Sequence, residues 1–133
     1  MEARKILIVD DDVDLCDSLK AILEGAGYNA TTATSRAEGM AKMKADQPDL
    51  LILDVMMETW HDGFEMSREL KRDQQLRQTP ILMLTSVEER TGVPVKSSAG
   101  DPDWLPVDGF LDKPVEPDVL LVEIEKLLEG AQA

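Results

Sequence analysis

The chain has 133 residues, 43% of them hydrophobic and 31% charged, which suits one folded domain with its own core and excludes an intrinsically disordered protein. Its formal net charge of −13 opposes binding to nucleic acid or to an anionic membrane surface, because both carry the same sign. A single cysteine excludes an internal disulfide framework, and the sequence has neither a membrane-spanning apolar run nor the apolar segment of a signal peptide, so we expect a cytoplasmic protein.

Five short segments have the composition of β-strands. In chain order they are ILIV (6–9), GYNATTAT (27–34), LLIL (50–53), ILML (81–84) and VDGFL (107–111). The three aliphatic runs are too short for helices and are bounded by polar or turn residues, which is typical of strands covered on both faces. The polar segment 27–34 is expected at an edge of the sheet.

Helical patterns alternate with these strands. An apolar stripe at 15–23 is followed by glycines that end a helix, and Ser35 with Glu38 has the spacing of a capping box that begins the next one. Residues 64–75 are helical by propensity, and 117–128 form the most regular amphipathic pattern, with a proline in its first turn. We therefore expect an α/β fold built from repeated strand–helix units.

Strand–helix units with right-handed connections predict a doubly wound, five-stranded parallel sheet of the flavodoxin-like type, with strand order 2-1-3-4-5 and helices on both faces. We expect this domain to span 1–129, with a short tail at 130–133. In such sheets ligands bind beyond the carboxyl ends of the strands, at the point where the strand order reverses. The residues that follow the strands are Asp10, Asp11 and Asp12, then Asp54, then Thr85 and Ser86, and finally Asp112, Lys113 and Pro114.

Three of these carboxylates would repel one another without a counter-charge. Asp10, Asp11 and Asp54 fall at the predicted reversal of strand order, where their oxygens suit a hard divalent cation, in the first place Mg²⁺. An aspartate can accept a phosphoryl group when a metal neutralises the transferring oxygens. Lys113 could pair with phosphate oxygens, and the Thr85 hydroxyl could donate to one of them.

Five segments carry a family resemblance: ILIVDDD (6–12), LLILDVMM (50–57), DGFE (62–65), LMLTS (82–86) and FLDKPV (110–115). In this order the chain resembles a response-regulator receiver domain of bacterial two-component signalling. The resemblance implies that Asp54 is the phosphoacceptor and that its donor is a phosphohistidine on a sensor histidine kinase or a histidine phosphotransfer protein. It implies Mg²⁺ ligation by Asp11 directly, by Asp10 mainly through water, by Asp54 and by the Met56 carbonyl.

The same resemblance implies a switch. Thr85 would be the switch hydroxyl, Lys113 the phosphate-binding lysine, and Phe110 the aromatic side chain that turns inward on phosphorylation. The chain would then act through a protein partner rather than as an enzyme. Met56, and Val87 two residues after Thr85, offer no group to orient an attacking water, so at most slow self-dephosphorylation is expected.

Other interpretations of these residues are less specific. A run of three aspartates alone is typical of a solvated turn or a helix N-terminus, and Asp12 keeps that interpretation as the N-cap of the first helix. A calcium loop is excluded because Leu15 stands where that loop needs glycine. An aspartate-nucleophile phosphatase needs a second acid where this chain has Met56. A scaffold of the same fold that is never phosphorylated is the remaining alternative.

The segment 87–108 departs from the family pattern. It is long, and its prolines and glycines cannot sustain a regular helix, so we expect the fourth helix to be short or disrupted. One hypothesis is that 92–106, with Trp104 as an anchor, docks an output partner. The alternative, held equal, is a packed surface loop in which Trp104 covers the sheet edge.

Overall fold

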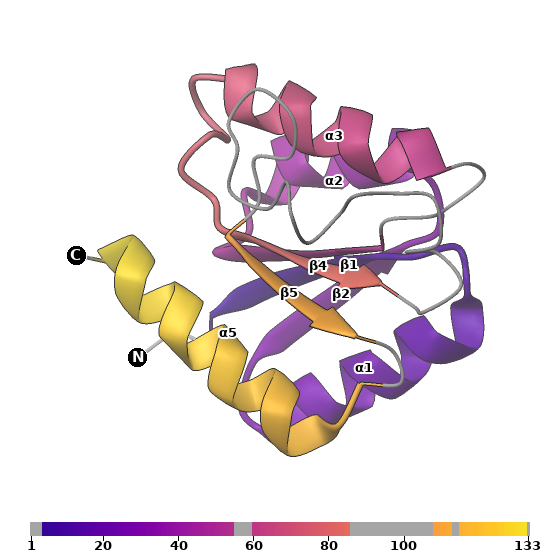
Figure 1. Cartoon of the computed structure of the whole chain (residues 1–133), viewed down its shortest axis with the longest axis vertical. Helices are drawn as coiled ribbons and strands as arrows, with labels where there is room; N and C mark the ends of the chain where they lie inside the picture. Colours follow the sequence, from indigo (N-terminus) through magenta and orange to yellow (C-terminus); the bar gives the residue numbers. More distant parts are fainter. Residues whose placement is uncertain (1–3, 55–59, 86–107, 113–114, 133) are drawn as a thin grey trace.

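Five parallel strands form one sheet in a computed structural model of the chain, which describes residues 4–54, 60–85, 108–112 and 115–132 (Figure 1). The strands are β1 (Lys5–Val9), β2 (Asn29–Ala33), β3 (Leu50–Asp54), β4 (Ile81–Thr85) and β5 (Gly109–Asp112). Their order across the sheet is β2-β1-β3-β4-β5, which is the predicted one. The polar strand β2 lies at an edge, where only one neighbour is needed.

Helices cover both faces of the sheet. They are α1 (Val13–Gly25), α2 (Arg36–Asp46), α3 (Trp60–Arg72) and α5 (Pro117–Gln132). Figure 1 shows α2 and α3 on one face and α1 and α5 on the other. This is the doubly wound, flavodoxin-like arrangement, and it makes the carboxyl ends of the strands the edge at which ligands bind.

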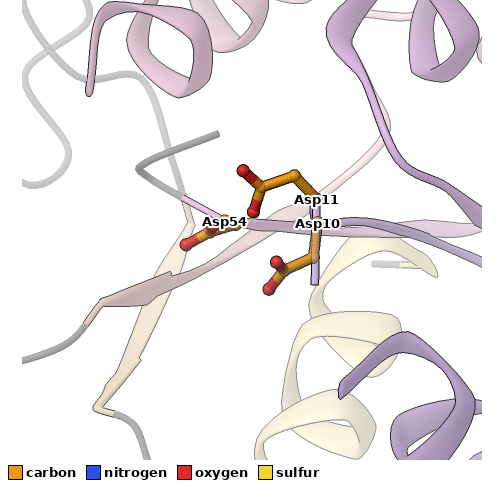
Figure 2. A group of neighbouring side chains, drawn as sticks. All are labelled: Asp10, Asp11 and Asp54. Carbon is orange, nitrogen blue, oxygen red and sulfur yellow. The ribbon is translucent and has the colours of Figure 1, made fainter. Parts of the chain in front are cut away.

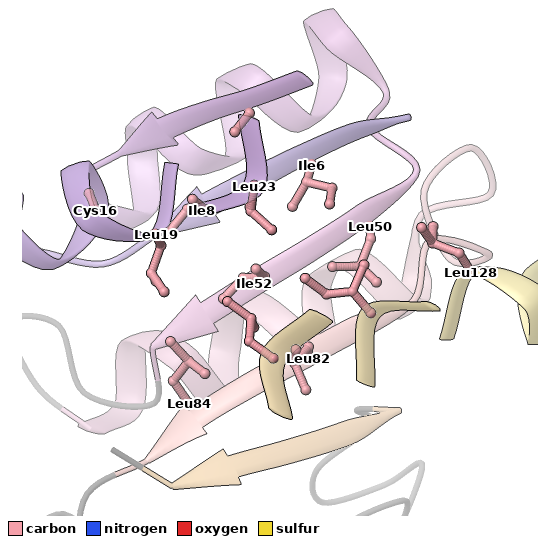
Figure 3. Packing of buried hydrophobic residues seen from close by; sticks show 13 residues of the cluster. Ile6, Ile8, Cys16, Leu19, Leu23, Leu50, Ile52, Leu82, Leu84 and Leu128 are labelled. Atoms are coloured by element: carbon pink, nitrogen blue, oxygen red, sulfur yellow. The ribbon is translucent and has the colours of Figure 1, made fainter. Parts of the chain in front are cut away.

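Alternating side chains of each strand fill two separate cores. In β1, Leu7 and Val9 pack with the buried residues of α2 and α3, whereas Ile6 and Ile8 pack with those of α1 and α5. Figure 3 shows the second core, in which Leu19 of α1 lies over the sheet. Because both faces are covered, these strands carry unbroken aliphatic runs, as a buried parallel sheet requires.

Side-chain caps fix where the first two helices begin. The Asp12 carboxylate accepts a hydrogen bond from the Leu15 amide at 3.1 Å, as predicted for an N-cap. At α2 the Ser35 hydroxyl accepts from the Glu38 amide at 3.2 Å, and the Glu38 carboxylate accepts from the Thr34 amide at 2.8 Å. The Glu38 carboxylate thus accepts from the amide of Thr34, the residue before the cap, rather than from the amide of the cap residue Ser35. This is a variant of the predicted capping box.

Some boundaries differ from the predictions, and others cannot be compared. The predicted helix at 64–75 is wrong by several residues, since α3 begins at Trp60 and ends at Arg72. Residues 130–132, expected as a tail, continue α5 to Gln132, and the domain limits themselves stay a prediction. The predicted disruption of a fourth helix and the surface at 92–106 lie outside the described residues. No described helix is long and apolar enough to cross a membrane.

Candidate functional site

The acidic residues of the sequence motifs meet at the carboxyl edge of β1 and β3. These two strands are neighbours, and Val9 pairs in register with Leu53. Asp10 directly follows Val9 and Asp54 directly follows Leu53, so an aspartate comes after each residue of this pair. Because the strand order reverses between β1 and β3, the site lies where the topology predicted it.

Three carboxylates come together at this edge. One oxygen each of Asp10, Asp11 and Asp54 lies within 4.8 Å of the others, and Figure 2 shows their side chains at the adjoining strand ends. Asp10 and Asp54 are each only 1% exposed, whereas Asp11 is exposed to solvent. Two buried carboxylates and one exposed carboxylate offer hard oxygen ligands with an open side, which fits a Mg²⁺ ion that keeps several waters.

The Asp10 side chain is held in place from the start of α1. Its Oδ1 atom accepts a hydrogen bond from the Asp12 amide at 2.9 Å, and its own amide donates to the Ala33 carbonyl at 3.0 Å. The first bond orients the carboxylate, and the second anchors its backbone to the end of β2. The same three-residue segment that carries Asp10 and Asp11 therefore also carries the cap of α1.

A buried thiol supports the same backbone. The Cys16 Sγ atom donates to the Asp10 carbonyl oxygen at 3.2 Å. Burial, followed by the nearby Asp10 charge, raises the pKa of Cys16 to about 11, so the thiol stays protonated near neutral pH and remains a donor. The sequence reasoning placed Cys16 only in an apolar stripe. The spacing of the stripe did not reveal this contact, because the hydrogen bond depends on how α1 packs against the sheet.

The remaining predicted site residues are placed only in part. Thr85 is the last residue of β4 and pairs with Asp112, and β4 lies beside β3 with Asp54 opposite Leu84. The Thr85 backbone thus reaches the edge that carries the acidic cluster. Phe110 lies in β5 opposite Met83. Met56 and Lys113 lie outside the described residues, so their predicted contacts, and the orientations of the Thr85 and Phe110 side chains, stay predictions.

Comparisons with known proteins identify the family and the fold. The family model described as "Response regulator receiver domain" matches residues 6–125. PhoP, the alkaline phosphatase synthesis transcriptional regulatory protein of Bacillus subtilis, is 32% identical over 129 residues, covering 97% of this chain and 50% of PhoP. The chain spans about half the length of PhoP and of other transcriptional regulators that it matches.

Solved structures share the fold over nearly the whole chain. The Vibrio cholerae chemotaxis protein CheY4 is 32% identical, with a TM-score of 0.78, covering 94% of this chain and 98% of that one. The signal receiver domain of a signal transduction histidine kinase from Syntrophus aciditrophicus is 33% identical, with a TM-score of 0.82, covering 96% of this chain and 92% of that one.

Proposed function

This chain belongs to the response regulator receiver domain family of two-component systems, and on that premise we propose that it accepts a phosphoryl group on Asp54 in a reaction that depends on Mg²⁺. The donor is a phosphohistidine of a sensor histidine kinase or of a histidine phosphotransfer protein. Receiver domains bind Mg²⁺ through an acidic pocket, and in this chain Asp10, Asp11 and Asp54 form such a group.

The observation that supports the proposal best is the acidic cluster. Three carboxylate oxygens lie within 4.8 Å of one another, where like charges repel and a bound cation would be stabilised, and two of the three side chains are buried. The group lies at the carboxyl ends of neighbouring strands, the edge at which α/β proteins bind ligands. Asp10 and Asp11 would hold the cation, and Asp54 would be both ligand and nucleophile.

In the proposed transfer an Asp54 carboxylate oxygen attacks the phosphorus atom of the phosphohistidine. A P–O bond forms, the P–N bond to the imidazole breaks, and the electron pair of that bond returns to the imidazole nitrogen. Bound Mg²⁺ supplies charge neutralisation of the transferring oxygens. The chain's own part is to position Asp54 at the end of a rigid buried strand, because such reactions depend on positioning and electrostatics.

The phosphorylated aspartate would then operate a switch. The added group carries a charge of about −1.5 to −2, which favours contacts with the Thr85 hydroxyl and the Lys113 ammonium. Phe110 would follow inward, and the resulting change in the surface would alter binding of an output protein, for which 92–106 with Trp104 is our candidate surface. Coupling of this kind typically amounts to about 1–3 kcal/mol.

The chain is proposed to be a phosphoacceptor and not a turnover enzyme. Hydrolysis of the phosphoaspartate needs a water molecule that is aligned for attack. At the two sequence positions from which receivers can orient that water, this chain has the apolar residues Met56 and Val87, so loss of the phosphoryl group should be slow.

A scaffold that is never phosphorylated is the alternative function, and one experiment separates the two. Purified protein is incubated with acetyl phosphate, with and without Mg²⁺, and the adduct is measured by intact-protein mass and phosphate-affinity electrophoresis. We expect an adduct on the wild type only with Mg²⁺, none on Asp54→Ala, and a normal adduct on Asp17→Ala, which removes an exposed carboxylate of α1. Absence of a Mg²⁺-dependent adduct on the wild type would favour the scaffold.

A further inference from the structure

A basic pocket lies at the edge of the sheet opposite the acidic cluster. It is a depression of about 400 Å³ between the connection from α3 to β4, the start of β5 and the C-terminal half of α5. In Figure 1 these segments lie together at the ends from which β4 and β5 start, away from their arrowheads. The charged residues that line it are Lys71, Arg77, Lys126 and Asp108.

The charge of this pocket is opposite in sign to the net charge of the chain. The protein has 27 acidic and 14 basic residues, yet three of the four charged residues described in the pocket lining are basic. The three cations come from separate parts of the chain, since Lys71 belongs to α3, Arg77 to the connection after it and Lys126 to α5. Positive charge gathered in a concave surface attracts anions more strongly than the same charges spread over a convex one.

One cation and the one carboxylate serve to build the pocket wall. The Lys71 Nζ atom donates to the carbonyl oxygens of Arg77 and Thr79 at 3.1 and 3.2 Å and lies 3.4 Å from the Asp108 carboxylate. Asp108 Oδ2 also accepts from the Ile81 amide at 2.8 Å. Lys71 thus ties the connection before β4 to the start of β5, and most of the Asp108 charge is used within the wall.

The two other cations are available for a ligand. Among the described residues, no carboxylate forms an ion pair with the Arg77 guanidinium or the Lys126 ammonium, and both residues are exposed. A guanidinium presents a planar pair of donors that matches a phosphate, and an ammonium adds a compact positive charge. Pro80 and Leu127 give the same pocket an apolar wall.

We propose that this pocket binds the phosphate group of a small molecule, with Arg77 and Lys126 as its ligands. The volume exceeds the need of a single phosphate ion, and the apolar wall suits the organic part of a phosphate ester. The two possible sources of the group, free phosphate and an organic phosphate, share this chemistry and are distinguished by the test below. The proposal is independent of phosphorylation at Asp54.

The test is an NMR titration of the ¹⁵N-labelled full chain in buffer that contains EDTA and no Mg²⁺. The probes are inorganic phosphate and phenyl phosphate, with phenol as the neutral control at constant ionic strength. We expect saturable shifts of the amides of Gln78, Asp108 and Leu127, and not of Asp11. Tighter binding of phenyl phosphate would identify an organic phosphate as the source, and equal binding would identify the free ion.

Matched variants show whether the named cations are responsible. Arg77→Gln and Lys126→Gln should each weaken binding about tenfold, because each removes a charged hydrogen-bond donor, whereas Lys44→Gln on α2 makes the same change in net charge and should leave it within about twofold. Thermal unfolding checks that the exposed substitutions keep the fold. The proposal is overturned if neither phosphate shifts these amides or if Lys44→Gln weakens binding as much. Saturation by an acidic peptide but by neither phosphate would also overturn it, in favour of a protein partner.

Discussion

Removing one charge from the acidic cluster should have opposite effects with and without Mg²⁺. Asp11→Asn keeps the size of the side chain but removes the exposed negative charge next to Asp10 and Asp54. Without Mg²⁺ the variant should be more stable than the wild type, because two repulsive pairs are lost. With Mg²⁺ the advantage should shrink or reverse, because the variant has lost a charged ligand.

The size of the effect follows from the separation of the carboxylate oxygens. At 4.8 Å two unit charges repel by about 0.9 kcal/mol in water and by about 3.5 kcal/mol at an effective dielectric constant of about 20. Asp11 is exposed, so the value for water is the appropriate one. Loss of the repulsion between Asp11 and the other two carboxylates should therefore contribute about 2 kcal/mol to the free energy of unfolding in the absence of Mg²⁺.

Mg²⁺ should stabilise the wild type by a comparable amount. A ligand that binds only the folded state stabilises that state by about 1.4 kcal/mol when its free concentration is about ten times its dissociation constant. The assay is urea unfolding followed by far-UV circular dichroism, in EDTA and in MgCl₂, for the wild type and Asp11→Asn. Asp17→Asn, which removes an exposed charge of α1, is the control and should respond to Mg²⁺ like the wild type.

Two results would refute this reasoning. One is a marked loss of stability of Asp11→Asn in EDTA, which would mean that the charge is stabilising rather than repelled. The other is an equal gain from Mg²⁺ in Asp11→Asn and in the wild type, which would mean that the ion binds elsewhere.

Three further predictions concern packing, pH and the lifetime of the phosphoryl group. Gly39→Ala should lower the free energy of unfolding by about 1–2 kcal/mol in urea titrations, because the new Cβ would lie 2.9 Å from Val9 Cγ2 and the gain in helix propensity is smaller than this overpacking. The hydrogen bond from the Thr34 amide lowers the pKa of Glu38 below its ordinary value of 4.5. The ionised carboxylate therefore stabilises the folded state above pH 4.5, and this stabilisation is lost as the pH falls through the lowered pKa. The difference in free energy of unfolding between wild type and Glu38→Gln, measured in urea, should shrink on going from about pH 7 to about pH 3. Met56→Asn should accelerate loss of the phosphoryl group from Asp54, measured by the decay of the intact adduct, because a carboxamide can orient water.

For each of these predictions, one result would contradict the reasoning. Gly25→Ala places its Cβ where nothing lies within 4 Å, and a loss there as large as at Gly39 would exclude the packing explanation. A pH-independent difference for Glu38→Gln would show that the ionised carboxylate is not what stabilises the cap. For Met56→Asn the comparison is Val122→Asn, an equivalent change on the exposed face of α5, and equal adduct lifetimes in the two variants would contradict the water-orienting argument.

The sequence was most informative where buried strands end in polar residues. The aliphatic runs at 6–9 and 50–53 predict neighbouring strands of a covered sheet, and parallel topology then places Asp10 and Asp54 at the same edge. The acidic cluster could therefore be predicted from local patterns and one topological rule. The start of α3 could not, because the residues from Trp60 to Gly63 have weak helix propensity, and propensity is a weak guide that tertiary context overrides.

Features that depend on tertiary packing were not predictable. The basic pocket joins Arg77, Asp108 and Lys126, which are far apart in the chain and carry no motif. The hydrogen bond from Cys16 to the Asp10 carbonyl depends on how α1 is placed on the sheet, and the pattern showed only an apolar stripe. Both depend on tertiary packing, which propensity and periodicity do not encode.

The junction between β1 and α1 has no spare residue. Only three residues join Val9 to Val13; the first two contribute carboxylates to the cluster and Asp12 caps the helix. A substitution that removes the Asp12 cap costs about 1 kcal/mol and leaves the two carboxylates of the cluster in the sequence. An insertion or deletion would displace the two carboxylates and the helix cap together. Because Asp10, Asp11 and the Asp12 cap stand at fixed positions between strand and helix, the length of this junction constrains the site as much as its residues do.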